Sequence, residues 1–92
     1  MTPIGLYIKV LIISRLARGP AKVEELDEIA RRAVERLGVR YDWRIWRDLL
    51  RREVVVEDGL AKLSERGRWY AEVGLRPVAK YVERALGVPV NA

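Results

Sequence analysis

The sequence predicts a single small domain that is mainly helical and carries one β-hairpin. The chain has 92 residues, which is too short for two independently folding domains. Half of its residues are apolar and about a third are charged, a balance typical of a globular chain rather than a disordered one. Apolar residues recur at helical spacing through most of the chain, whereas one β-branched segment ends in Asp58-Gly59, a strong signal for a tight hairpin turn.

A first helix is predicted over residues 3–18, before Gly19-Pro20 ends the helical pattern. Its apolar residues recur at steps of three and four: Ile4, Tyr7, Ile8, Leu11, Ile12 and Leu16. The apolar stretch Ile4 to Ile13 includes Lys9 and is shorter than the roughly twenty residues that span a membrane. We therefore expect a buried helix in a cytoplasmic protein, with no targeting sequence and no membrane insertion.

Two further helices are predicted over residues 22–37 and 42–52. The first of these is amphipathic, with its charged residues, Asp27 among them, mainly opposite its apolar face, and Gly38 ends it. Asp42 is the expected N-cap of the next helix, because a carboxylate there can accept the free amide hydrogens of the first turn. The core face of that helix is expected to hold Ile45, Trp46, Leu49 and Leu50.

The remaining segments are a hairpin over residues 53–63 and a last helix over residues 65–87. The β-branched run Glu53 to Glu57 leads into the Asp58-Gly59 turn, and the segment Leu60 to Leu63 forms the return strand. Ser64 is expected to cap the last helix. Because a proline inside a helix costs about 3 kcal/mol, we expect a kink or break near Pro77.

The composition excludes most familiar catalysis. The chain has no cysteine and no histidine, so disulfides, thiol nucleophiles, zinc fingers and histidine acid–base pairs are all absent. The aliphatic hydroxyls Thr2, Ser14 and Ser64 have no histidine to activate them. Carboxylate pairs such as Glu57-Asp58 fall on positions expected to be exposed, where burial cannot raise their pKa. We therefore expect no enzyme activity, no cofactor and no metal site.

The charge balance favours a polyanionic partner. Fourteen arginines and four lysines against thirteen acidic residues give a net charge of +5. Such a balance suits nucleic acid or a membrane surface, although a solvated basic face has the same composition. Glutamine is absent and asparagine occurs once, a depletion of thermolabile residues that points to a thermophilic source.

The order of three helices, a hairpin and a closing helix resembles the winged helix-turn-helix domain of small archaeal and bacterial transcription regulators related to the MarR, ArsR and PadR groups. The most specific match is Leu60-Ala61-Lys62-Leu63-Ser64-Glu65-Arg66-Gly67, in which a wing strand ends in the pattern Leu-[Ser/Thr]-x-x-Gly. The resemblance implies that the third helix enters the major groove of double-stranded DNA, the second helix braces it, and the hairpin reaches the adjacent phosphates or the minor groove. It also implies a nucleoid-associated protein that is either a transcription regulator or an architectural DNA-binding factor, with sequence-specific and non-specific binding both left open.

The third helix carries a basic stripe that fits this role. Arg44, Arg47, Asp48 and Arg51 are spaced by three and four residues, and Arg40 and Arg52 flank them. Lys62 is the only basic residue of the hairpin. The expected DNA-binding residues are therefore Arg40, Arg44, Arg47, Arg51, Arg52 and Lys62. The alternative is that Arg44 and Arg51 pair with Asp48 on a solvated helix face.

Some features favour a second hypothesis, in which the domain is a protein-interaction winged helix within a larger nucleic-acid or membrane-remodelling complex. The hairpin tip Glu57-Asp58-Gly59 is acidic, and like charges repel phosphate. A separate departure from the family pattern is the link of residues 38–41, which is longer than a compact helix-turn-helix turn and leaves the docking angle of the third helix open. The aromatic pairs Tyr41 and Trp43, and Trp69 and Tyr70, can stack on bases or pack in the protein, and packing is the simpler interpretation.

The last helix indicates self-association. Val78, Tyr81, Val82 and Ala85 form an apolar stripe that must bury against the domain's own core or against a second copy. In the regulators that the chain resembles, the terminal helix, often with the first helix, forms a two-fold dimer. We expect a homodimer through the first and last helices, with a helix folded back on its own core as the alternative. The operator sequence and any effector are not specified by the sequence.

Overall fold

The computed structural model describes residues 2–42 and 44–90, and for Ile45 it describes the backbone alone. The helices are α1 (Pro3–Leu16), α2 (Val23–Arg36), α3 (Arg44–Leu49), α4 (Glu65–Trp69), the π-helix η1 (Tyr70–Gly74) and α5 (Leu75–Leu86). The strands are β1 (Ala21–Lys22), β2 (Val54–Glu57) and β3 (Leu60–Leu63). The prediction of a mainly helical fold with a small antiparallel β element is confirmed.

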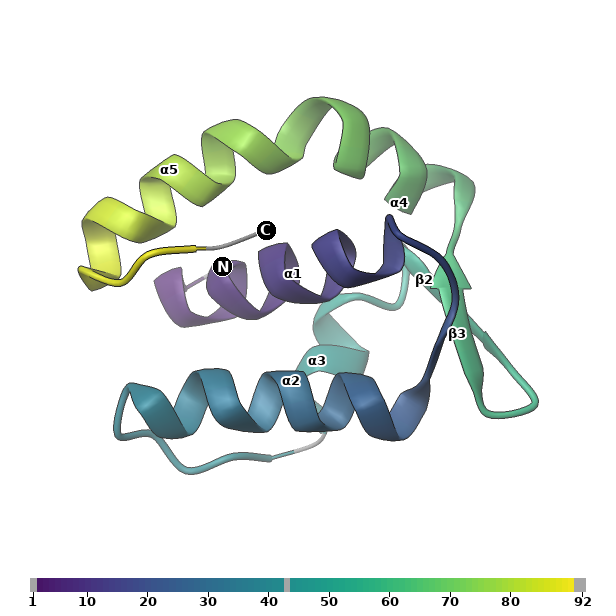
Figure 1. Cartoon of the computed structure of the whole chain (residues 1–92), viewed down its shortest axis with the longest axis horizontal. Coiled ribbons are helices and arrows are strands. Elements are labelled where there is room, and N and C mark those ends of the chain that lie inside the picture. The colour runs from purple at the N-terminus through teal and green to yellow at the C-terminus, as the bar shows by residue number, and fades with distance from the viewer. Residues whose placement is uncertain (1, 43, 91–92) are drawn as a thin grey trace.

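Helix α1 lies at the centre of the molecule. Figure 1 shows it between α2 and α3 on one side and the arc formed by α4, η1 and α5 on the other. This arc, residues 65–86, is called the C-terminal arm below. A helix that is apolar on all sides must be covered on all sides, and Tyr7, Ile8, Val10, Ile12 and Ile13 are all buried. Within the described chain, none of the exposed large hydrophobic residues lies on α1.

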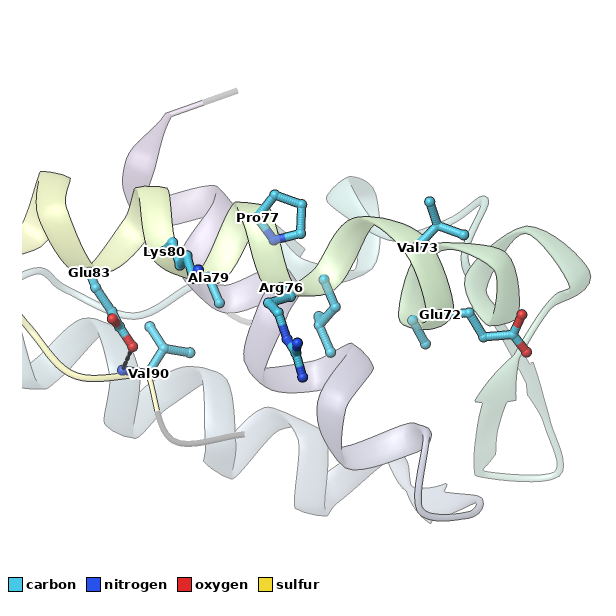
Figure 2. Close-up of a pocket in the computed structure, with 10 residues that line it drawn as sticks. Glu72, Val73, Arg76, Pro77, Ala79, Lys80, Glu83 and Val90 are labelled. Atoms are coloured by element: carbon cyan, nitrogen blue, oxygen red, sulfur yellow. Dashed lines mark hydrogen bonds between the residues drawn. The ribbon is translucent and has the colours of Figure 1, made fainter.

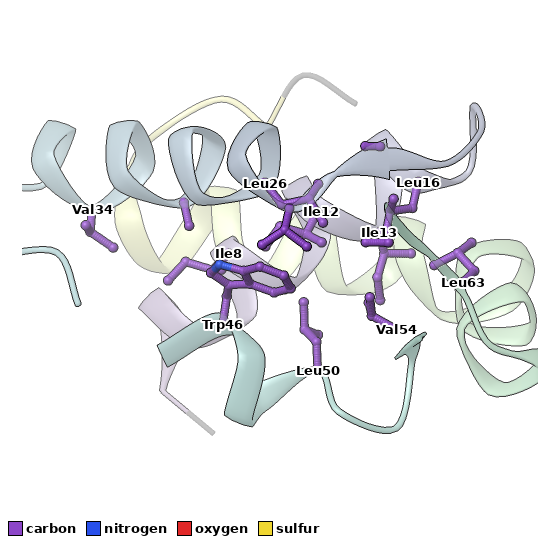
Figure 3. Packing of buried hydrophobic residues seen from close by; sticks show 14 residues of the cluster. Ile8, Ile12, Ile13, Leu16, Leu26, Val34, Trp46, Leu50, Val54 and Leu63 are labelled. Atoms are coloured by element: carbon purple, nitrogen blue, oxygen red, sulfur yellow. The ribbon is translucent and has the colours of Figure 1, made fainter. Parts of the chain in front are cut away.

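The core divides into two clusters that α1 connects. One joins α1 to α2, α3 and the strands, and Trp46, the largest of its side chains, packs there with Ile8, Ile12 and Leu50 (Figure 3). The other joins Tyr7 of α1 to Val82 of α5, together with Ala33 of α2 and neighbouring residues. Trp46, Leu49 and Leu50 therefore take the predicted core positions of α3, while the side chain of Ile45 lies outside the described residues.

The sheet has three strands, not the two that the sequence analysis predicted. The antiparallel strand order is β1-β3-β2, with Ala21 opposite Ala61 and Val54 opposite Leu63. The missed strand β1 has two residues, too few for an alternating pattern, and Lys22 belongs to it rather than to α2. The hairpin turns at Asp58 and Gly59, whose φ angles of 52° and 77° match the two positive values of a type I′ turn.

Helix α3 is shorter than the predicted span of residues 42–52. After Leu49 the chain makes a turn, and two of its carbonyls bond to Ser64 rather than to downstream helical amides. The Ser64 hydroxyl donates to the Arg52 carbonyl at 2.6 Å, and the Ser64 amide donates to the Glu53 carbonyl at 2.8 Å. This attachment directs the following β-branched segment into the sheet.

The predicted last helix, residues 65–87, is divided into α4, η1 and α5. Ser64 caps α4 as predicted, with its hydroxyl accepting from the Gly67 amide at 3.1 Å. The π-helical segment Tyr70–Gly74 lies just before Pro77, which sits in the first turn of α5. A proline removes one backbone donor, and a π-helical turn is one of the recognised ways in which a helix accommodates such a disruption.

Candidate nucleic-acid interface

The predicted recognition surface contains a groove between α3 and the hairpin. Trp46, Leu50 and Val54 are buried at its base, and Arg47, Arg51 and Val56 are exposed along it. Because α3 ends at Leu49 and a short turn leads directly into β2, the two elements lie next to each other. Two of the six predicted DNA-binding residues, Arg47 and Arg51, are thereby brought to one groove.

Arg44 lies at the first turn of α3 and is paired with Asp42. Its Nε and Nη2 lie 3.2 and 2.9 Å from the Asp42 carboxylate, whose Oδ1 also accepts from the Arg44 amide at 3.0 Å. Asp42 thus bonds one amide of the first turn, but the described part of α3 begins at Arg44, two residues after Asp42 and not directly after it as the N-cap prediction expected. Hydrogen bonding to the Arg44 side chain lowers the pKa of the Asp42 carboxyl below its usual value. Arg44 is therefore exposed but already has an anionic partner, and this partner is not Asp48.

Arg47 is held by a carboxylate from α2. Its Nη2 lies 3.5 Å from Asp27 Oδ2, and its guanidinium lies 5.5 Å from the centre of the Trp46 ring. Asp27 Oδ1 accepts hydrogen bonds from Trp46 Nε1 at 2.6 Å and from the Tyr41 hydroxyl at 3.3 Å. Burial, together with the negative charge of Asp27, raises the pKa of Tyr41 to about 12. Asp27 thus connects α2, the link before α3, and α3 itself.

Four predicted residues keep unpaired charges. Within the described part of the chain, Arg40, Arg51, Arg52 and Lys62 are exposed and form no ion pair. Arg40 lies beside Arg44 at a shallow hollow that Tyr41 also lines, so Tyr41 both packs against the core and borders this surface. The predicted packing or stacking of Trp43 lies outside the described residues.

Lys62 is not part of the groove. It lies opposite Val55 in the β2–β3 register, and cross-strand partners project from the same face of a sheet. The groove is lined by Val54 and Val56, which alternate with Val55 and so project from the other face. The acidic tip residues Glu57 and Asp58 are exposed, as the sequence analysis expected.

Helix α2 shows the contrasting pattern, in which basic and acidic residues neutralise one another. Arg31 pairs with both Glu28 and Glu35, and Arg32 pairs with Glu28. Hydrogen bonding to Arg31 lowers the pKa of Glu28 below its ordinary value. The free positive charge near the groove therefore comes from the ends and surroundings of α3 rather than from α2.

The predicted dimerisation residues do not form one surface. Val82 is 0% exposed and packs in the cluster with Tyr7 and Ala33, and Val78 is half-buried against the same cluster. These two residues therefore cover the chain's own core, which was the alternative to a dimer contact. Tyr81, at 51% exposed, and Ala85 face outward. The homodimer itself stays a prediction, but the buried side chain of Val82 does not offer it a contact surface.

On the C-terminal arm, the packing predicted for Trp69 and Tyr70 is present within this chain for Tyr70 and not for Trp69. Trp69 and Val73 are both more than half exposed, whereas Tyr70 packs against the core beneath the Lys9 ammonium group. Figure 2 shows a groove along this arm, with Arg76 and Glu83 among its lining residues and the Val90 amide bonded to Glu83. This groove belongs to the side of the molecule opposite α2 and α3 (Figure 1).

Asp27 is the residue of this surface whose contacts could not be predicted from the sequence. Its position in an amphipathic helix assigned it to the solvated charged face, and no spacing in the sequence connects it to Tyr41, Trp46 or Arg47. Among the described residues, no group of three or more acidic side chains could hold a metal ion. No helix in the described ranges is long and apolar enough to cross a membrane.

The functional conclusion below depends on the contacts and charges described above. No family model, curated protein or solved structure matches this chain.

Proposed function

We propose that this protein is a winged-helix protein that binds double-stranded DNA through α3 and the neighbouring hairpin, acts in transcription regulation or DNA architecture, and has no catalytic activity. The element order supports the proposal, because α2 and α3 are consecutive helices that both pack on α1, Trp46 of α3 donates a hydrogen bond to Asp27 of α2, and the β2–β3 hairpin follows α3 directly. In helix-turn-helix proteins the second of two such helices lies in the major groove.

The observation that carries the proposal is the distribution of unpaired cations. Arg40, Arg51 and Arg52 lie at the two ends of α3 and have no ion-pair partner within the described chain, while Arg31 and Arg32 of α2 are neutralised. An exposed guanidinium without a partner can bind phosphate oxygens or the O6 and N7 atoms of guanine. Cations without an ion-pair partner are thus available beside α3, where a recognition helix needs them, and the C-terminal arm carries others in the described chain, Arg76 and Lys80 among them.

The acidic groups near this surface limit the affinity that we expect. Asp48 on α3 and Glu57 and Asp58 at the hairpin tip are exposed, so the tip is poorly suited to contact phosphate. We expect about four phosphate contacts per chain, which would lower the affinity roughly a hundredfold between 50 and 200 mM salt.

The test is fluorescence anisotropy of a labelled 25-base-pair duplex of random sequence across that salt range. We expect Arg51→Glu/Arg52→Glu to abolish most of the binding and to flatten the salt dependence. Arg76→Glu/Lys80→Glu on the C-terminal arm is the matched control, since it changes the net charge equally on the opposite side of the molecule. Equal losses in both variants, or no binding by the unaltered protein at 50 mM salt, would refute the proposal.

The second candidate function is recognition of a protein within a larger assembly. The hairpin favours it, because Val55 and Leu60 are exposed on the same face of β2 and β3, beside the acidic tip. An apolar surface of this kind is more typical of a protein contact than of a phosphate contact. Absence of DNA binding together with an equimolar protein complex that Val55→Asp disrupts would favour this function.

A further inference from the structure

The three interactions of Asp27 are divided between its two carboxylate oxygens. Oδ1 accepts from Trp46 Nε1 at 2.6 Å and from the Tyr41 hydroxyl at 3.3 Å, so this oxygen fixes α3 and the link before it against α2. Oδ2 faces the Arg47 guanidinium at 3.5 Å. One carboxylate therefore supports the position of α3 and also restrains a cation on its exposed side.

The Asp27–Arg47 pair lies at the boundary with solvent. The Asp27 and Arg47 side chains are 29% and 41% exposed, so a phosphate can approach the guanidinium without unfolding the domain. An ion pair at such a position contributes little to stability, and a second anion can replace it. The contacts with Trp46 are different, because that side chain is 1% exposed and stays in the core.

Arg47 lines the same groove as Arg51, which forms no ion pair within the described chain. A DNA backbone that reaches Arg51 along this groove also comes close to Arg47. The guanidinium that the DNA backbone meets there, that of Arg47, is already paired with the carboxylate of Asp27. Binding exchanges one anionic partner of Arg47 for another, whereas Arg51 gains a partner without losing one.

We propose that Asp27 competes with DNA phosphate for Arg47 and thereby limits the affinity of the protein for DNA. Asp27 is in this view a positioning residue with two effects, since it supports α3 through Oδ1 and restrains Arg47 through Oδ2. The inference rests on the proposed DNA-binding function and extends it to the control of affinity.

Asp27→Asn is the decisive variant. Asparagine keeps an oxygen that can accept from Trp46 Nε1 but loses the charge that holds Arg47. Glu24→Gln is the matched control, because Glu24 is an exposed acidic residue of the same helix with no ion-pair partner in the described ranges. We expect Asp27→Asn to tighten binding of the 25-base-pair duplex about fivefold and the control about twofold at most.

The salt dependence separates this effect from a structural one. Release of Arg47 to phosphate should steepen the slope of log affinity against log salt by up to about 0.9. In an Arg47→Gln background, Asp27→Asn should raise the affinity for DNA no more than Glu24→Gln does. An equal gain in Asp27→Asn and Glu24→Gln, or a gain that persists without Arg47, would overturn the inference while leaving DNA binding intact.

A second measurement keeps the inference testable if Asp27→Asn does not fold, as judged by its near-ultraviolet circular dichroism. Because Arg47 loses one partner when it gains another, Arg47→Gln should weaken DNA binding less than Arg51→Gln does. A loss in Arg47→Gln equal to or larger than that in Arg51→Gln would overturn the inference. Failure of the unaltered protein and of Asp27→Asn alike to bind would instead refute the proposed function.

Discussion

Replacement of Lys9 by methionine is expected to be strongly destabilising, because Lys9 is the cation of a buried ion pair. Its Nζ lies 3.1 Å from Glu53 Oε1, and the two side chains are only 11% and 9% exposed. The Lys9 ammonium also lies 4.3 Å from the centre of the Tyr70 ring. The second oxygen of Glu53, Oε2, is buried with no hydrogen-bond partner within the described chain. Methionine preserves much of the apolar stem but leaves the carboxylate without its counter-charge.

The magnitude follows from the burial of both partners. Breaking a buried pair by removing one member typically costs about 3–5 kcal/mol, since an uncompensated charge stays in the interior. A domain of this kind has a total stability of about 5–15 kcal/mol, so Lys9→Met should remove a large fraction of it. Replacing both residues, as in Lys9→Met/Glu53→Met, should cost much less than either single change, because no charge is then left buried.

Urea denaturation followed by circular dichroism measures these free energies of unfolding. Arg32→Met is the matched control, since Arg32 pairs with Glu28 on the surface and its removal should cost less than about 1 kcal/mol. A cost below 1 kcal/mol for Lys9→Met would refute the argument. So would a double variant whose destabilisation equals the sum of the two single values.

Three further predictions concern helix α4 with its cap and the link before α3. Gly67→Ala should destabilise the domain by about 3 kcal/mol in urea denaturation, because an added Cβ would lie 2.1 Å from the Glu53 carbonyl oxygen; an unchanged midpoint would contradict this. Ser64→Ala should cost about 1–2 kcal/mol by the same measurement through loss of the α4 cap, and a cost near zero would show that the cap does not contribute. The pKa of Tyr41 is raised in the folded state from 10.0 to about 12, so its contribution to stability is complete below pH 10 and is lost as the pH rises from 10 to 12. Tyr41→Phe should therefore reduce the decline in thermal stability over that interval, and an identical decline in the variant would argue against the shift.

The sequence was informative wherever local rules determine the structure. The amphipathic pattern of α2, the Asp58-Gly59 turn and the capping role of Ser64 all depend on residues within a few positions of one another. The apolar character of α1 on all sides indicated burial for the same reason, although it also suggested a dimer contact. In the structure the chain's own α2, α3 and α5 cover this helix.

Features that depend on tertiary contacts could not be predicted in this way. Strand β1 exists because Ala21 pairs with Ala61, forty residues away along the chain. The apolar stripe of the last helix gave no indication that Val82 would face α1 while Tyr81 would face solvent. The π-helical segment Tyr70–Gly74 adds to this difficulty, because it changes the helical phase ahead of α5.

Charge is the property for which local sequence was most misleading. Residues 39–52 contain five arginines and two aspartates, a local excess of three positive charges. In the structure Asp27 of α2 pairs with Arg47, and Asp42 pairs with Arg44. Within this segment, the cations that form no ion pair in the described chain are therefore Arg40, Arg51 and Arg52, which flank α3. Binding of a phosphate backbone depends on which cations are left without an ion pair, and not on the net charge summed along the sequence. The charge reversals most informative about DNA binding are therefore those at Arg51 and Arg52, and the acidic residue most informative about its strength is Asp27.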